Sequence, residues 1–146
     1  MPLSDLLIFT HLAATLFMTG LIWFVQVVHY PLMAQVPKPQ FQAFQQAHVT
    51  RTTWVVGPPM LLEAACATGI LLVPSATTPF YWSLMGFMLL VSIWVSTALF
   101  QVPAHHTLMD GFDRITHRSL VRSNWLRTFA WSTRSVVASL IVIAHV

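Results

Sequence analysis

Charged residues are scarce in this chain. Asp, Glu, Lys and Arg together make up 8% of its 146 residues, whereas an ordinary soluble domain contains roughly 25%. None of the four types occurs between Asp5 and Lys38, or between Glu63 and Asp110. Each of these stretches can cross a bilayer, which requires about 20 apolar residues per helix. The scarcity argues against a water-soluble fold and predicts an integral membrane protein.

Cysteine is almost absent as well. Cys66 is the single cysteine, so the chain has no internal disulfide, and a metal site built from several thiolates is excluded. Because Cys66 lies within an apolar stretch, we expect it to be a small buried packing residue.

Four apolar segments have the length of a membrane-spanning helix. They run from Leu6 to Val28, Thr53 to Val73, Phe80 to Leu99, and Trp125 to Ala144. Pro31 and Pro103 follow the first and third segments, where we expect them to end the helices. Residues 41–52 resemble an interfacial helical extension of the second segment, and residues 112–121 resemble a second such helix before the fourth segment. The sequence therefore predicts one all-α domain, residues 1–146. We expect an up-and-down bundle of four transmembrane helices with short interfacial helices in the first and third loops.

The positions of the basic residues predict the orientation, because cytoplasmic loops carry an excess of Lys and Arg. The second loop contains neither residue. The first and third loops and the helix starts beside them contain Lys38, Arg51, Arg114, Arg118, Arg122 and Arg127. In an up-and-down bundle these two loops share one face of the membrane. We therefore predict a multi-pass protein of the bacterial inner (plasma) membrane with both termini on the non-cytoplasmic side. Topology and anionic lipid heads account for the basic charge, so we expect no nucleic-acid partner.

Polar side chains within the apolar segments are energetically costly and usually face the bundle interior. Helical spacing brings one group of them to the predicted cytoplasmic end: His29, His48, Arg51, Gln101, His105, Asn124 and Arg127. Glu63 and Arg134 lie deeper, each about ten residues or roughly 15 Å from that end. We predict an ion pair between them, which either fixes helix register or serves the function. We expect His11, nearer the other face, to be a lone packing residue.

The polar group at the cytoplasmic end has three interpretations. Neutral imidazoles are suitable metal ligands, and His29, His48 and His105 are the best trio for iron, haem, copper or zinc. However, no dense ligand motif occurs and the nearby arginines add positive charge, so our first expectation is a site without metal or other cofactor. The histidines would then act as acid or base and the arginines would stabilise an anion. In the third interpretation these side chains only satisfy helix ends and lipid phosphates.

Several motifs carry a resemblance to a known family. Within residues 20–44, a proline follows the first apolar segment and a Phe-rich segment comes next. In the second half, Gln101-Val102-Pro103-Ala104-His105 precedes Asn124-Trp125-x-Arg127 and Trp131-x-x-Arg134. These motifs resemble the small four-helix membrane proteins grouped with fungal anthrone oxygenases, which typically have an asparagine where this chain has His105. The resemblance implies oxidation of a flat phenolic or polyketide-like substrate by oxygen, without a metal, between the helices.

On this hypothesis the chain is an oxygenase-like membrane oxidoreductase that acts on a small lipophilic, phenolic or quinone-like substrate. His48 or His105 would be the base, and Arg51 and Arg127 would bind the anion. The substrate would also contact His29, Gln101, Asn124 and Trp131, the last by stacking on a flat ligand or on a guanidinium. Two alternatives remain open: a metal- or haem-binding membrane protein, and a non-enzymatic accessory subunit or small carrier. The sequence also leaves open a homo-oligomer or a partner in a membrane complex.

Overall fold

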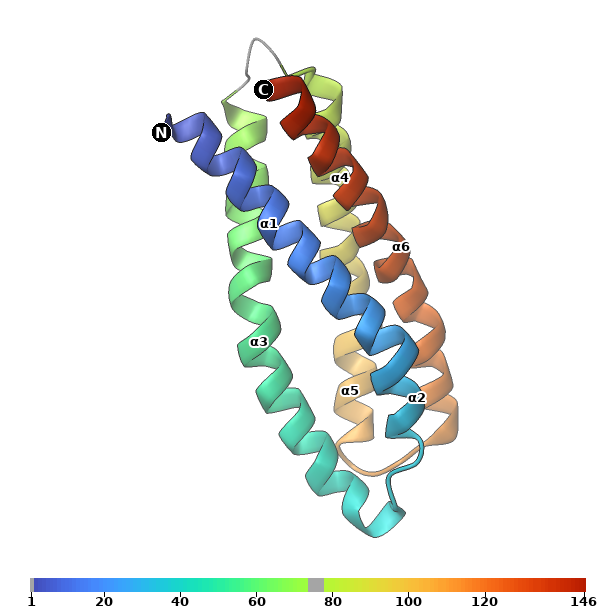
Figure 1. Ribbon diagram of the computed structural model, residues 1–146. Coiled ribbons are helices and arrows are strands. Elements are labelled where there is room, and N and C mark those ends of the chain that lie inside the picture. Colours follow the sequence, from blue (N-terminus) through green and yellow to red (C-terminus); the bar gives the residue numbers. More distant parts are fainter. Residues whose placement is uncertain (1, 74–77) are drawn as a thin grey trace.

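The computed structural model of the protein describes residues 2–73 and 78–146. These residues contain no strand and form four long helical rods side by side, with both chain ends at one end of the bundle (Figure 1). The elements are α1 (Leu3–Phe24), η1 (Val25–His29), α2 (Tyr30–Met33), α3 (Lys38–Leu72), α4 (Phe80–Ser96), η2 (Thr97–Gln101), α5 (Val102–Leu108) and α6 (Arg114–His145). The four rods, Leu3–Met33, Lys38–Leu72, Phe80–Leu108 and Arg114–His145, are each long and apolar enough to cross a membrane. The structure thus agrees with the prediction of an all-helical bundle.

The expectation that Pro31 and Pro103 end their helices is wrong. Each proline follows a π-helical turn, η1 or η2, and the helix continues beyond it as α2 or α5. Within these wide turns, the N–H of Tyr30 bonds to the carbonyl of Val25, and the N–H of Val102 bonds to that of Thr97. A proline in a regular α-helix clashes with the carbonyl four residues earlier. A wider turn just before the proline relieves this conflict, so the rod continues.

Residues 41–52 extend the second helix, as expected, but the structure shows no separate short helices in the described parts of the first and third loops, which corrects a second prediction. Residues 41–52 belong to α3, which begins at Lys38 with Pro39 in its first turn. Pro is compatible with that position because the first N–H groups of a helix have no partner within it. In the other segment, Asp113 caps α6 by accepting a hydrogen bond from the N–H of Thr116 at 2.7 Å. Residues 40–52 and 114–124 contain neither proline nor glycine, so both helices run directly into their apolar segments. Further along, α3 also continues through Pro58 and Pro59.

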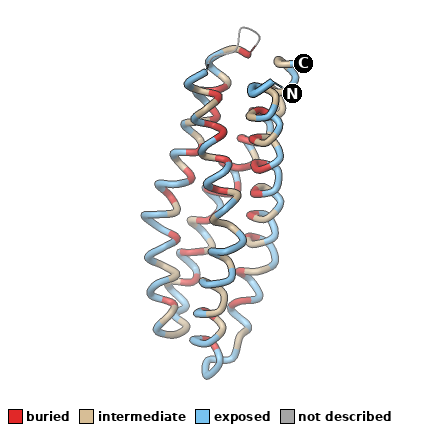
Figure 2. Tube along the Cα trace, turned by 90° about the vertical axis from the view of Figure 1, so that its left-hand side faces the viewer, coloured by how far each residue is buried: buried red, intermediate tan, exposed pale blue. Residues whose placement is uncertain are grey.

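The core lies along the axis of the bundle, where the inward sides of the helices meet (Figure 2). Its middle contains Met18, Ile22, Ile93 and Trp131, each at most 4% exposed. Large apolar side chains also cover the outside, including Leu61, Leu99 and Phe129 at 60–63% exposure. Cys66 is buried, as expected for a packing residue. The polar groups described below lie among the inward-facing residues.

Candidate functional site

Glu63 on α3 and Arg134 on α6 meet in the middle of the bundle. The Arg134 Nη2 and Nε atoms both lie 3.0 Å from Glu63 Oε1, and neither side chain is exposed to any degree. The carboxylate accepts two further hydrogen bonds, from Thr15 Oγ1 at 2.8 Å and from Trp131 Nε1 at 3.1 Å. The charge of Glu63 is therefore both neutralised and hydrogen-bonded on two sides, as a buried carboxylate requires.

The Nη2 and Nη1 atoms of Arg134 extend this arrangement to further residues on α1 and α4. Arg134 Nη2 lies 3.0 Å from Nε2 of His11 on α1, and Nη1 donates to the carbonyl oxygen of Gly86 on α4. We call these side chains the central network: His11, Thr15, Glu63, Trp131 and Arg134. A guanidinium can only donate, so His11 Nε2 accepts and the neutral ring carries its proton on Nδ1. The central network thus joins all four rods.

The expectation of a lone His11 is therefore wrong. Its position one turn before Thr15 on α1 was the available signal, since both residues lie on the same face of that helix. The hydrogen bond between His11 and Arg134 could not be predicted, because it depends on the position of α6 along the bundle relative to α1. His145, at the other end of the chain, instead pairs with Asp5, with Nε2 and Oδ1 2.9 Å apart.

A second polar group lies toward the end of the bundle opposite the termini. We call it the end cluster: Gln26, His29, Tyr30, Gln45, His48, Gln101, His105, Asn124 and Arg127. The rings of His29 and His48 stack with centroids 4.4 Å apart, and those of His48 and His105 lie 5.2 Å apart. Stacked rings direct their nitrogen atoms past one another rather than toward a common point. Within residues 2–73 and 78–146, no three His, Cys, Asp or Glu side chains are placed to hold a metal ion.

Hydrogen bonds determine which nitrogen atom of His105 carries the proton. Gln45 Nε2 lies 3.1 Å from the carbonyl oxygen of His105 and 3.0 Å from its Nδ1. An amide nitrogen donates to both, so Nδ1 accepts and the neutral ring is protonated on Nε2. That Nε2–H donates to the Tyr30 hydroxyl at 3.1 Å, and the hydroxyl in turn donates to Gln101 Oε1 at 3.4 Å. Both nitrogen atoms of His105 are thus engaged.

His48 has a different environment. Its Nδ1 lies 3.0 Å from the Thr52 hydroxyl one turn further along α3. No side chain in the described part of the chain hydrogen-bonds its Nε2. His29 Nε2 is buried and likewise lacks a partner there. His48 and His29, rather than His105, thus have nitrogen atoms available to a ligand.

Arg127 is a buried cation without a counter-ion. It is 8% exposed, and the two ion pairs found among the described residues involve other side chains. Its Nη1 donates to Asn124 Oδ1 at 3.1 Å, and Asn124 donates to Gln26 Oε1 at 2.8 Å. The guanidinium carbon lies 5.1 Å from the ring centroid of Trp131. Its Nε is buried without a partner in the described part of the chain.

Two of the site residues predicted from the sequence, Arg51 and Trp131, lie outside the end cluster. Arg51 is exposed and takes part in no hydrogen bond or ion pair within the described residues. Trp131 is fully buried as a member of the central network, with its ring against the guanidinium of Arg127. Of the two stacking partners considered for Trp131, the structure thus shows the guanidinium. Sequence reasoning missed Tyr30 and Gln45, although Gln45 lies three residues before His48 on the same helix.

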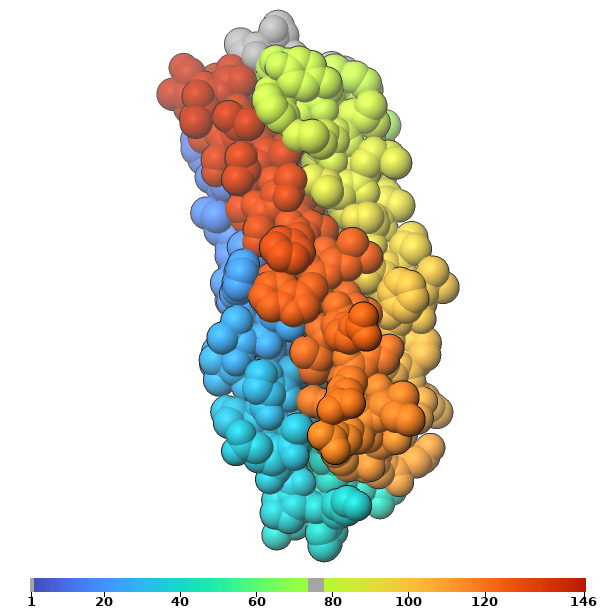
Figure 3. All heavy atoms as spheres, turned by 90° about the vertical axis from the view of Figure 1, so that its right-hand side faces the viewer, coloured from blue at the N-terminus to red at the C-terminus, as the bar shows by residue number. Residues whose placement is uncertain are grey.

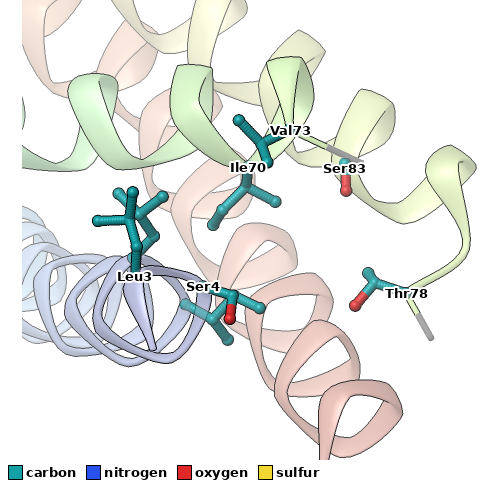
Figure 4. A pocket seen from close by; sticks show the side chains of 8 residues that line it. Leu3, Ser4, Ile70, Val73, Thr78 and Ser83 are labelled. Carbon is teal, nitrogen blue, oxygen red and sulfur yellow. The ribbon is translucent and has the colours of Figure 1, made fainter. Parts of the chain in front are cut away.

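A small pocket at the termini end offers no comparable chemistry. It has a volume of about 80 Å³ and lies between the start of α1, the end of α3 and the start of α4 (Figure 4). Its lining includes Leu3, Ile70, Val73 and Thr78, and no titratable side chain. The end cluster, in contrast, combines an unpaired cation with histidine nitrogen atoms, so it can hold an anion and accept a proton. No family model, curated protein or solved structure matches this chain.

Proposed function

We propose that this chain is a multi-pass protein of the bacterial inner (plasma) membrane with both termini on the non-cytoplasmic side. The four rods are long and apolar enough to span a bilayer, and their outer surface carries large apolar side chains. Both termini lie at one end of the bundle (Figure 1). The helices that begin with Lys38 and Arg114 start at the other end. An excess of basic residues at that end favours its cytoplasmic placement.

The function that the geometry supports best is binding and oxidation of a small lipophilic molecule with an acidic oxygen, such as a phenol or enol. The observation that carries this proposal is the unpaired Arg127. Burying a cation in an apolar bundle costs several kcal/mol unless an anion compensates it. A bound phenolate or enolate would supply that charge and a hydrogen-bond acceptor for the free Nε. His48 is only partly buried, so a ligand can approach its free nitrogen atom.

The free nitrogen of His48 makes it the base of this proposal. His48 removes a proton from the substrate, and the guanidinium of Arg127 stabilises the resulting anion. Dioxygen is the oxidant and accepts electrons from that anion. Over the whole reaction a methylene group becomes a carbonyl: one oxygen atom enters the product, and the other leaves as water with both methylene hydrogens. His105, Tyr30 and Gln101 orient the substrate oxygen through their hydrogen-bond chain.

Oxygen consumption by the detergent-purified protein tests the enzymatic part of this proposal. An anthrone-type phenol should be converted to the quinone with one dioxygen consumed per product. His48→Gln should lower kcat by about a hundredfold, the scale of a lost general base. His106→Gln is the matched control, because His106 is exposed and lies outside the end cluster. Its kcat should stay within about twofold of the unmodified protein.

Two results would replace this function with one of the alternatives. Stoichiometric iron, copper, zinc or haem in the active protein would favour the metal-binding interpretation. If neither anthrone-type phenols nor quinols are turned over, and deletion disrupts a membrane complex instead, the chain is an accessory subunit or carrier.

A further inference from the structure

A groove with a volume of about 790 Å³ opens between the start of α6 and the segment that ends the first rod. Figure 3 shows the first turns of α6 at the molecular surface, next to the residues that follow α1. One side of the groove is formed by Arg114, Arg118 and Arg122, and apolar lining comes from Pro31, Phe112 and Val121. The groove therefore combines positive charge with an apolar wall.

The three arginines form a row on one face of α6. They are spaced four residues apart, so each lies about one helical turn beyond the last. All three are exposed, and none takes part in the ion pairs found among the described residues. The nearest acidic residue in the sequence, Asp113, caps the helix by accepting the N–H of Thr116 at 2.7 Å. The positive charge of the row is thus available to a ligand.

His117 fixes the two walls of the groove relative to one another. Its side chain is buried, and Nε2 lies 2.9 Å from the carbonyl oxygen of Tyr30. Since a carbonyl only accepts, Nε2 carries the proton and donates it in this bond. The Phe112 ring packs against the His117 ring with centroids 5.5 Å apart. The groove is therefore held in shape by contacts between its two walls and is not a gap between independent helices.

We propose that this groove binds an anionic phospholipid, with its phosphate on the Arg114, Arg118 and Arg122 row. Guanidinium groups match phosphate oxygens in charge and geometry. Pro31, Phe112 and Val121 contact the apolar part of the lipid below its headgroup. The site is at the end of two membrane-length rods, where lipid headgroups lie when the rods span a bilayer. The inference thus rests on the proposed membrane insertion, but not on a ligand in the end cluster.

Native mass spectrometry of the detergent-purified chain, titrated with phosphatidylglycerol or phosphatidylcholine, tests this site. Each arginine replaced by Gln should weaken phosphatidylglycerol binding about fivefold, and R114Q/R118Q/R122Q about a hundredfold. The corresponding triple Lys variant, which keeps the charge, should lose much less. K38Q/R51Q is the control, because it removes two exposed cations from the first half of α3 and leaves the groove unchanged. The single Arg118→Gln variant tests the site even if the triple Gln variant does not fold.

Three outcomes would overturn the proposal. Phosphatidylcholine binding as tightly as phosphatidylglycerol would show that the anionic headgroup is not recognised. An equal loss in K38Q/R51Q would show general electrostatic attraction in place of a site. Complete competition by soluble glycerol phosphate would identify a free phosphate as the ligand. Loss of phosphatidylglycerol binding alone leaves the end-cluster proposal untouched, because Arg127 and His48 are unchanged in these variants.

Discussion

Arg134 and Glu63 form an ion pair at 3.0 Å between α6 and α3, and neither side chain is exposed. The pair holds the two helices at one register, because a shift of a single turn would leave two buried charges unpaired. Hydrogen bonds to His11, Thr15, Trp131 and the carbonyl oxygen of Gly86 connect the pair to all four rods. The central network is therefore a structural element, whereas the end cluster is the candidate site.

Glu63→Gln should destabilise the protein by about 3–5 kcal/mol, because it leaves the Arg134 charge buried without compensation. Denaturation in detergent micelles, followed by circular dichroism, measures the loss. E63L/R134M removes both charges and should lose less than Glu63→Gln alone. A double variant that is no more stable than Glu63→Gln would contradict the assignment of the loss to an uncompensated Arg134 charge.

Trp131→Phe should cost about 2 kcal/mol of stability. Phenylalanine keeps an aromatic ring but lacks the indole N–H that donates to Glu63, and it is a weaker cation–π partner for Arg127. The same unfolding measurement applies. Trp125→Phe is a matched control at a partly exposed position and should cost less than about 1 kcal/mol. Equal effects at both positions would contradict the assigned role of Trp131.

The hydrogen bonds from Gln45 predict that neutral His105 is protonated on Nε2. Nitrogen-15 NMR of protein labelled on histidine distinguishes the two ring nitrogen atoms by chemical shift. Gln45→Leu removes the donor to Nδ1 and should allow the proton to exchange between the two positions, whereas His106→Gln should leave the His105 signals unchanged. A proton found on Nδ1 of His105 in the unmodified protein would invalidate the hydrogen-bond chain through Tyr30.

Asp113 should make the start of α6 sensitive to acid. Hydrogen bonds from Thr116 lower the pKa of the Asp113 carboxyl below its ordinary value. Because its pKa is lower in the folded protein than in the unfolded chain, the Asp113 carboxylate stabilises the start of α6. This stabilisation is complete at pH values above the pKa that Asp113 has in the unfolded chain. This contribution is lost as pH falls through the lowered pKa. The protection of the Thr116 amide against hydrogen exchange, relative to the intrinsic rate at each pH, should therefore fall at acid pH. Asp113→Asn keeps a capping side chain but cannot titrate, so its exchange should lack this acid-induced change.

The bundle and the central pair could be predicted because both depend on local spacing. Apolar segment length defines a spanning helix, and equal depth along two helices is enough to pair Glu63 with Arg134. The continuation of the helices past Pro31 and Pro103 could not be predicted, because the rule that proline ends a helix does not consider a π-helical turn before the proline.

The choice between Arg51 and Arg127 as the proposed anion-binding arginine also required the structure. Gln45 and Arg51 lie three residues to either side of His48, so they point roughly 60° to opposite sides of it. Either direction could have faced the core. Packing of α3 buries Gln45 and exposes Arg51. The phenolic hydroxyl of Tyr30 was missed for a related reason, since only its contact with His105 shows that the side chain belongs to the polar group.

The most direct test of the central claim, that buried Arg127 holds an anionic oxygen, is the affinity of the purified protein for an anthrone-type phenol and its methyl ether. Isothermal titration should show that the phenol binds more tightly than the ether. Arg127→Gln should weaken phenol binding at least about tenfold, as expected for a lost hydrogen bond between charged groups. Arg51→Gln, at an exposed position, should bind as the unmodified protein does. Equal affinity of Arg127→Gln and unmodified protein for the phenol would contradict the account.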